Sequence, residues 1–149
     1  MTIVVDANVV AALVLPLPYD DLATEAMNYW IAQGERLIAP ILMEYELVTI
    51  IRRGVANSQL RKERALPVLY QIQESGVETI APTVQLHEQA LYWAERIGQS
   101  KAYDAHYLAL AIRENAPFWT ADRRLANSAQ LAGLTWVHWI GDWTPGDSQ

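Results

Sequence analysis

The stretch TIVVDANVV, residues 2–10, places one acidic residue, Asp6, directly after a run of β-branched apolar residues. Ile3 to Val5 predicts a buried β-strand, and residues 7–15 predict a helical segment that the prolines at 16 and 18 end. Asp6 therefore falls at the carboxyl end of the first strand. Open parallel α/β sheets bind their ligands outside the carboxyl ends of the strands.

The rest of the chain repeats this alternation of short apolar runs and longer helical patterns. Further strands are predicted at 37–39, 77–80, 117–120 and 135–139. Helices are predicted at 20–33, 40–53 (opened by Pro40), 58–74 (with Ser58 as N-cap), 83–97, 101–115 (capped by Ser100) and 122–131. The pattern is typical of an α/β protein with a central, mostly parallel sheet of four to five strands flanked by helices.

Length and composition favour one globular domain. The chain has 149 residues, 52% of them hydrophobic and 19% charged, and no cysteine, so disulfides and thiolate metal sites are excluded. We expect the domain to span residues 1–141 and the segment 142–149 to be a loose tail. The apolar start has no basic leader, and no segment is long enough to span a membrane, so we expect a cytoplasmic protein with no membrane partner.

Four acidic residues lie inside otherwise apolar or small-residue segments: Asp6, Glu46 in PILMEYELVTII, Asp104 in KAYDAHYLALA and Asp122 in FWTADRRL. Burying a carboxylate costs several kcal/mol unless a partner compensates it, and none of these segments supplies an obvious basic partner. A shared divalent cation would compensate all four, because Mg²⁺ and Mn²⁺ prefer carboxylate and water oxygens. We therefore expect the fold to bring the four carboxylates together.

Helical periodicity leaves the glutamate of this set open. Glu46 shares a helical face with Leu42, Thr49 and Ile50, but the helix is apolar nearly all round, and Glu44 competes for the same role. Asp122 is also a plausible simple N-cap, and Asp104 lies in the first turn of its helix, where the macrodipole favours negative charge.

The net charge of −6 disfavours nucleic-acid binding, which normally needs a positive surface. Two features weaken that objection. Bound cations would neutralise the four acids locally, and basic residues cluster between positions 52 and 64, although the sequence favours a solvated helical face as the explanation of this cluster.

The order of these motifs resembles the PIN-domain ribonucleases, and most closely the VapC-like toxins of toxin–antitoxin pairs. The matching elements are DANVV, a proline followed six residues later by Glu46 and Leu47, the run YDAHYLALA, and TADRRL at a strand end. The resemblance selects Glu46 over Glu44 and implies a metal-binding, catalytic set of Asp6, Glu46, Asp104 and Asp122. Asn8 and Thr120 match supporting polar positions.

The resemblance implies a three-layer PIN fold and RNA hydrolysis assisted by one or two Mg²⁺ or Mn²⁺ ions. The carboxylates would hold the ions, and the ions would activate a water molecule and stabilise charge on the phosphate. An RNA substrate, a small cognate antitoxin and a homodimer are the partners it implies.

The sequence leaves other functions open besides that of a ribonuclease toxin. A housekeeping RNA-processing nuclease of the same fold and a catalytically inactive PIN binding module both fit the motifs. A haloacid-dehalogenase-like phosphatase fits poorly, because Asn8 stands where a second aspartate is needed and no lysine follows Lys101. P-loop chemistry lacks its motif.

The histidines and tryptophans favour structural interpretations. His87, His106 and His138 show no metal-ligand spacing, and His106 is expected to serve packing or the surface. Trp119, Trp136 and Trp139 are expected in the core, whereas the pairs Tyr29–Trp30 and Tyr92–Trp93 are alternative candidates for a partner surface.

Overall fold

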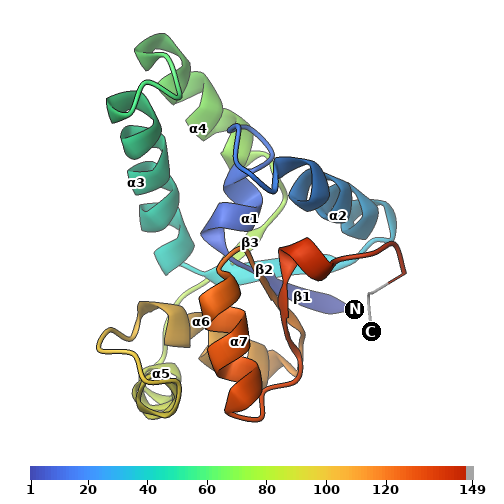
Figure 1. Ribbon diagram of the computed structural model, residues 1–149, viewed down its shortest axis with the longest axis vertical. Helices are drawn as coiled ribbons and strands as arrows, with labels where there is room; N and C mark the ends of the chain where they lie inside the picture. The colour runs from blue at the N-terminus through green and yellow to red at the C-terminus, as the bar shows by residue number, and fades with distance from the viewer. Residues whose placement is uncertain (147–149) are drawn as a thin grey trace.

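Five parallel strands form the centre of the molecule, seen in a computed structural model that describes residues 1–146 (Figure 1). Their order is β3-β2-β1-β4-β5, and every pairing is parallel. The strands are β1 (Thr2–Val5), β2 (Arg36–Pro40), β3 (Glu78–Ile80), β4 (Phe118–Thr120) and β5 (Val137–Trp139). The sequence-based prediction of a mostly parallel sheet of four to five strands is confirmed.

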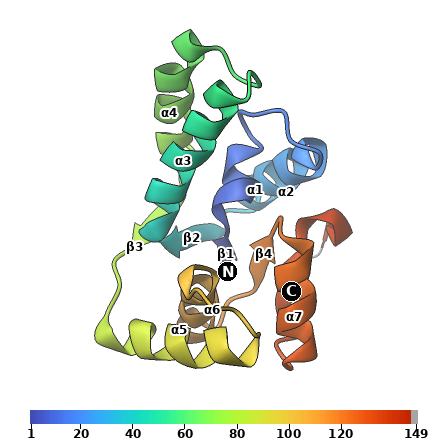
Figure 2. The same ribbon diagram turned by 60° about the vertical axis from the view of Figure 1, so that its left-hand side comes forward.

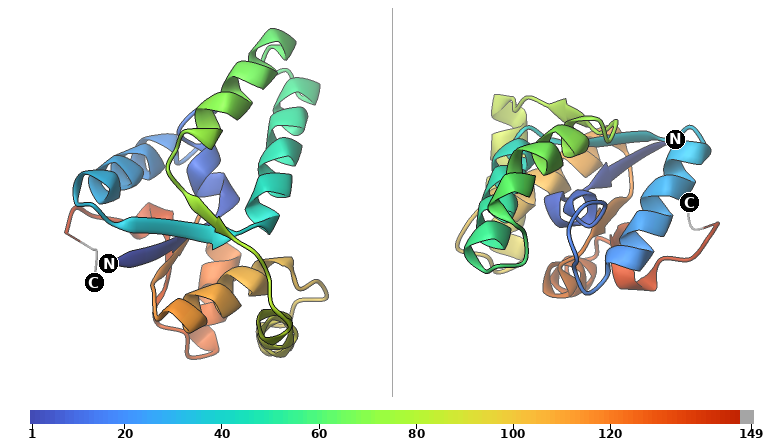
Figure 3. Two further views of the ribbon diagram at one scale, coloured as in Figure 1. Left: turned by 180° about the vertical axis from the view of Figure 1, so that it is seen from behind. Right: turned by 90° about the horizontal axis from the view of Figure 1, so that it is seen from above.

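Helices cover both faces of the sheet. In Figures 1 and 2, α1 to α4 lie on one side and α5 to α7 on the other, and Figure 3 shows α3 and α4 projecting as an antiparallel pair. None of the described helices is long and apolar enough to cross a membrane. The helices are α1 (Ala7–Ala11), α2 (Asp20–Ala32), α3 (Leu42–Ala56), α4 (Ala65–Gln73), α5 (Val84–Arg96), α6 (Tyr103–Glu114) and α7 (Arg123–Leu131), with short 3₁₀ turns at Lys62–Arg64 and Ile140–Asp142.

The strand order places a topological switch point between β1 and β4. From β1 the chain first adds β2 and β3 on one side, and then returns to add β4 and β5 on the other. Connections on either side of such a point diverge and leave a crevice at the carboxyl ends of the two strands. Asp6 follows β1 and Asp122 follows shortly after β4, so both acids lie at this crevice.

Helix α6 has an apolar sequence on most of its sides because it is buried in the core. Helix α6 packs against β1, β2 and β4 on one side and against α5 on another, so residues 107–111 are almost fully buried. Ile3, Val4 and Val5 of the central strand are all 0% exposed, as the β-branched run predicts.

Ser58 ends a helix, whereas the sequence predicts that it starts one. It adopts a positive φ of 59° immediately after α3, and the backbone N–H groups of Gln59 and Leu60 donate to the carbonyl of Gly54. This is the left-handed position that commonly completes a helix C-terminus. Helix α4 begins only at Ala65, after the 3₁₀ turn.

Two other predicted helix starts are also displaced. Pro40 is the last residue of β2, and α3 begins two residues later at Leu42. Ser100 does not cap α6, which begins at Tyr103 with Ala102 as an N-cap that makes no side-chain hydrogen bond.

The expectation of a loose tail is wrong at Trp143. Its side chain is 3% exposed and packs edge-on against Tyr29 and Trp30, with ring centroids 5.7 and 6.3 Å away. Residues 147–149 of the predicted tail lie outside the described part of the chain. Trp30 is itself fully buried, so it belongs to the core and is unavailable to a partner surface.

Candidate active site at the switch point

Asp6 is the buried centre of the site. Its side chain caps α1 by accepting a hydrogen bond from the Val9 N–H on Oδ1 at 3.0 Å. Its Oδ2 accepts from the Ala121 N–H at 3.0 Å and from the Thr120 hydroxyl. Donors from the start of α1 and from the end of β4 therefore hold the Asp6 carboxylate in place.

Thr120 connects the two acids of the crevice. Its hydroxyl donates to Asp6 and accepts a 3.0 Å hydrogen bond from the Asp122 N–H, and its side chain is fully buried at the end of β4. The Asp122 side chain caps α7 by accepting from the Leu125 N–H at 3.1 Å. Asp122 is therefore the N-cap of α7, as the sequence allows. Thr120, predicted as a supporting residue, contacts both Asp6 and the backbone of Asp122.

Glu46 reaches the site from α3. Its Oε1 accepts a 2.6 Å hydrogen bond from the Tyr107 hydroxyl on α6. Burial raises the pKa of Glu46 above its ordinary value, the Tyr107 hydrogen bond opposes that shift, and the negative charges of Asp6 and Asp104 add to it. The charges of both Asp6 and Asp104 therefore act on Glu46.

Asp104 lies in the first turn of α6, half-buried. Its Oδ2 accepts a hydrogen bond from the Gln99 side-chain amide at 3.0 Å. Burial raises the pKa of Asp104, the Gln99 hydrogen bond lowers it, and the charge of Asp122 raises it. Each of the four acids thus either changes the pKa of another member of the set through its charge, or has its own pKa changed in this way.

A groove of about 920 Å³ runs over the site between α3 and the start of α6. Glu46 and Asp104 line it together with Asn8, while Asp6 and Asp122 do not contribute to its lining. Two cations, Arg53 and Lys101, also line it. The lining of the groove therefore combines carboxylates with cationic side chains.

Glu44 does not share this groove. It is exposed on α3 and its Oε1 accepts a hydrogen bond from the Thr79 hydroxyl of β3 at 3.3 Å. Of the two glutamates that helical periodicity leaves open, Glu46 is the one that faces Asp104 across the groove.

The donor chemistry of the site suits a hard divalent cation. All four acids offer oxygen, and burial also raises the pKa of Asp6. Within the described residues, however, no three His, Cys, Asp or Glu side chains are placed to hold one metal ion together. Mg²⁺ usually keeps several of its waters and takes only one or two protein carboxylates, so this arrangement fits an ion held partly through water.

The family model of the PIN domain matches residues 3–131 of the chain. The matched span contains all four acids, most of β1, and the whole of β2, β3 and β4. The chain belongs to the PIN-domain family.

Three solved structures resemble this PIN domain in fold. PAE2754 from Pyrobaculum aerophilum has a TM-score of 0.69 at 19% identity, covering 95% of this chain and 85% of its own. VapBC2 from Rickettsia felis, solved with a DNA fragment from its promoter, has a TM-score of 0.66 at 14% identity, covering 93% and 98%. VapC20 from Mycobacterium tuberculosis, a toxin that cleaves the sarcin–ricin loop, has a TM-score of 0.60 at 18% identity, covering 80% and 87%. No curated protein matches the chain.

Sequence reasoning missed the residues that hold the acids of this PIN domain in place. The Tyr107 hydroxyl donates a hydrogen bond to Glu46, and the Gln99 side-chain amide donates one to Asp104. Tyr19 is also near the site: burial and the charges of Asp6 and Asp122 raise its pKa to about 12. The available signal for Tyr107 was its position three residues after Asp104 on an apolar helix, where a lone hydroxyl needs a partner.

Proposed function

We propose that this PIN domain is a Mg²⁺- or Mn²⁺-dependent endoribonuclease that hydrolyses RNA phosphodiester bonds. The observation that carries the proposal is the convergence of Glu46 and Asp104 on one groove whose walls also carry Arg53 and Lys101. Carboxylates suit a divalent cation, and cationic side chains suit a phosphate backbone.

The residues of the site would have distinct roles in this reaction. Asp6 after β1, Asp104 on α6 and Glu46 on α3 would supply carboxylate oxygens, directly or through water. Tyr107 orients Glu46, while Thr120 orients Asp6 and fixes the backbone of Asp122. When bound, one or two divalent cations would supply an activated water and offset charge on the phosphodiester. Arg53 and Lys101 would hold the flanking phosphates.

The biological role we propose is that of a toxin neutralised by a small cognate antitoxin and acting as a homodimer. Likeness in fold to VapC20 and to VapBC2 supports this role. A housekeeping nuclease would use the same groove and the same chemistry. The two roles would differ in the effect of RNA cleavage on the growth of the cell.

Cleavage of labelled RNA by the parent and by Asp104→Asn tests the chemistry. The parent should cut in Mg²⁺ or Mn²⁺ and stop in EDTA, while Asp104→Asn should lose activity by orders of magnitude. Glu44→Gln is the matched control, because this acid lies two residues from Glu46 and outside the groove. An active Asp104→Asn variant would refute the assigned site, and a parent inactive with either metal would leave the inactive binding module as the better description.

Induced expression in a bacterial host tests the role. The toxin role requires that the parent arrests growth and that Asp104→Asn does not. Normal growth with active enzyme present would favour the housekeeping nuclease.

A further inference from the structure

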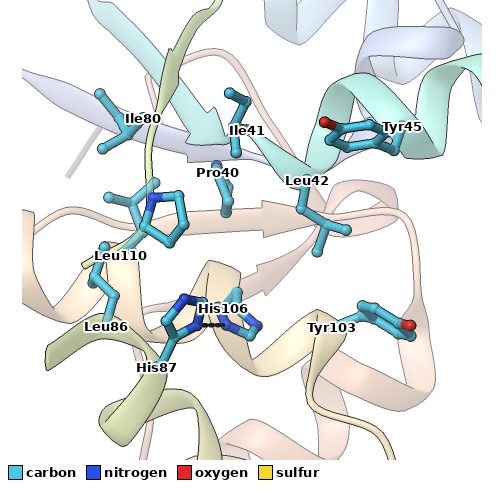
Figure 4. A pocket seen from close by; sticks show the side chains of 11 residues that line it. Pro40, Ile41, Leu42, Tyr45, Ile80, Leu86, His87, Tyr103, His106 and Leu110 are labelled. Atoms are coloured by element: carbon cyan, nitrogen blue, oxygen red, sulfur yellow. Dashed lines mark hydrogen bonds between the residues drawn. The ribbon is translucent and has the colours of Figure 1, made fainter. Parts of the chain in front are cut away.

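A second pocket opens beside the acidic groove, and Figure 4 shows its lining side chains. It encloses about 230 Å³ between the end of β2, the start of α3, and helices α5 and α6. Leu42, Tyr45 and Tyr103 line both this pocket and the acidic groove. A chain lying in the groove can therefore place a side group in the pocket without leaving the site.

Two exposed tyrosines mark the shared boundary. Tyr45 on α3 is 70% exposed and Tyr103 on α6 is 60% exposed. In Figure 4 both rings lie on the same side of the pocket, with Leu42 between them. Such exposure of aromatic rings contributes little to folding, but it offers flat surfaces on which another ring can stack.

Two histidines give the otherwise apolar pocket a polar edge. His106 Nδ1 lies 2.7 Å from the Ala102 carbonyl, which only accepts, so this nitrogen carries the hydrogen. In the neutral pair, His106 Nε2 then accepts from His87 Nδ1, 2.8 Å away. That tautomer leaves His87 Nε2 as a hydrogen-bond acceptor.

We propose that this pocket binds one unstacked nucleobase of single-stranded RNA, next to the phosphate held in the acidic groove. The inference rests on the proposed ribonuclease function and adds a substrate contact to it. Single-stranded RNA is commonly recognised by splaying out a base and stacking it on aromatic side chains. The pocket is smaller than the roughly 300–1,000 Å³ of sites for drug-sized ligands, so it suits one planar ring system.

The histidine edge adds one hydrogen-bond contact to the stacking surface. An acceptor at His87 Nε2 can pair with an N–H donor on the edge of the base, and every RNA base carries such a donor. Stacking itself tolerates every base, so the base preference is expected to be modest.

Binding of a short labelled single-stranded RNA, measured by fluorescence anisotropy in EDTA, tests the pocket without cleavage. The Tyr45→Ala, Tyr103→Ala double variant should bind about 5- to 100-fold more weakly than the parent, since base stacking has about this effect. The Tyr45→Phe, Tyr103→Phe double variant should bind like the parent. Tyr70→Ala is the matched control, because Tyr70 on α4 is 65% exposed and lies outside both pockets.

An RNA with abasic positions isolates the base from the backbone. The parent should bind the abasic RNA more weakly than intact RNA, and the alanine double variant should bind both alike. Equal binding of the two RNAs by the parent, or an alanine variant that binds like the parent, would overturn the proposal. So would a change from dimer to monomer in the alanine variant, because the pocket would then belong to a second copy of this chain.

Cleavage assays with Mg²⁺ on the same proteins separate the two proposals. Cleavage by the parent without any base-dependent binding would contradict only the proposal of a nucleobase pocket. Base-dependent binding without cleavage would contradict only the proposed nuclease function.

Discussion

The Tyr107 hydroxyl donates a 2.6 Å hydrogen bond to Glu46 Oε1 across 61 residues of sequence. The tyrosine ring is 1% exposed and stacks on Phe118, with centroids 5.4 Å apart. The donor therefore has little freedom to move, and it fixes one oxygen of Glu46 in the groove.

Tyr107→Phe keeps the stacked ring and removes this donor. We expect the free energy of unfolding to fall by about 1 kcal/mol, because half-buried Glu46 can take water instead. Affinity for Mn²⁺ should fall by roughly 10- to 100-fold, as is typical when the group that orients a ligand is lost. Urea denaturation and Mn²⁺ titration measure the two effects. Tyr70→Phe should change neither, and unaltered Mn²⁺ affinity in Tyr107→Phe would show that Glu46 needs no orienting partner.

Thr120→Val should destabilise the protein by about 1–3 kcal/mol, because it leaves buried Asp6 and the Asp122 N–H each without one partner. The replacement has nearly the same shape, so packing changes little. Thr120→Ser keeps the hydroxyl and should retain most of the stability. Thermal denaturation of the three proteins provides the comparison, and equal melting temperatures for Thr120→Val and the parent would contradict it.

Asp104→Asn should be as stable as the parent in EDTA, or more stable. Burial and the Asp122 charge both disfavour the Asp104 carboxylate, and an asparagine can still accept from Gln99. Mn²⁺ should raise the melting temperature of the parent by mass action, and the variant should gain less. A variant strongly destabilised in EDTA would identify Asp104 as a structural helix-start residue.

Without metal, the stability of the protein should decrease as pH rises through the carboxyl range. The pKa values of Asp6, Glu46 and Asp104 are raised above their ordinary values of 3.8 for Asp and 4.5 for Glu. Between the ordinary and raised values the folded state binds more protons than the unfolded state, so the contribution of these groups falls with pH. Saturating Mn²⁺ should reverse the trend, because metal binding requires ionised carboxylates. Melting temperatures across this range in EDTA and in Mn²⁺ test the sign, and a rise with pH in EDTA would contradict it.

Local signals account for the positions of Asp6 and Asp122 next to their strands and helices, which the sequence predicts. Asp6 follows a β-branched run and Asp122 precedes a helix, so their positions at strand ends depend only on neighbouring residues. The parallel sheet likewise follows from the alternation of strands and helices.

Long-range contacts account for what the sequence leaves out. Nothing near Tyr107 indicates that α3 would bring Glu46 within hydrogen-bond distance, and nothing near Trp143 indicates that α2 would bury it. Ser58 misleads for a different reason, because serine both caps helix starts and occupies the left-handed position after helix ends. Only the adjacent turn chemistry separates these two uses.

The partners of Asp6 have a consequence for the order of events during synthesis. Asp6 leaves the ribosome well before its donors Thr120 and Ala121, which follow with sequence separations of 114 and 115. Strand β1 is held between β2 and β4, so the nascent chain carries an unfinished central strand until β4 emerges. Contacts of such long range also form slowly. The acidic crevice is therefore completed only after β4 has been synthesised, and a truncated chain that lacks β4 has no site to assemble.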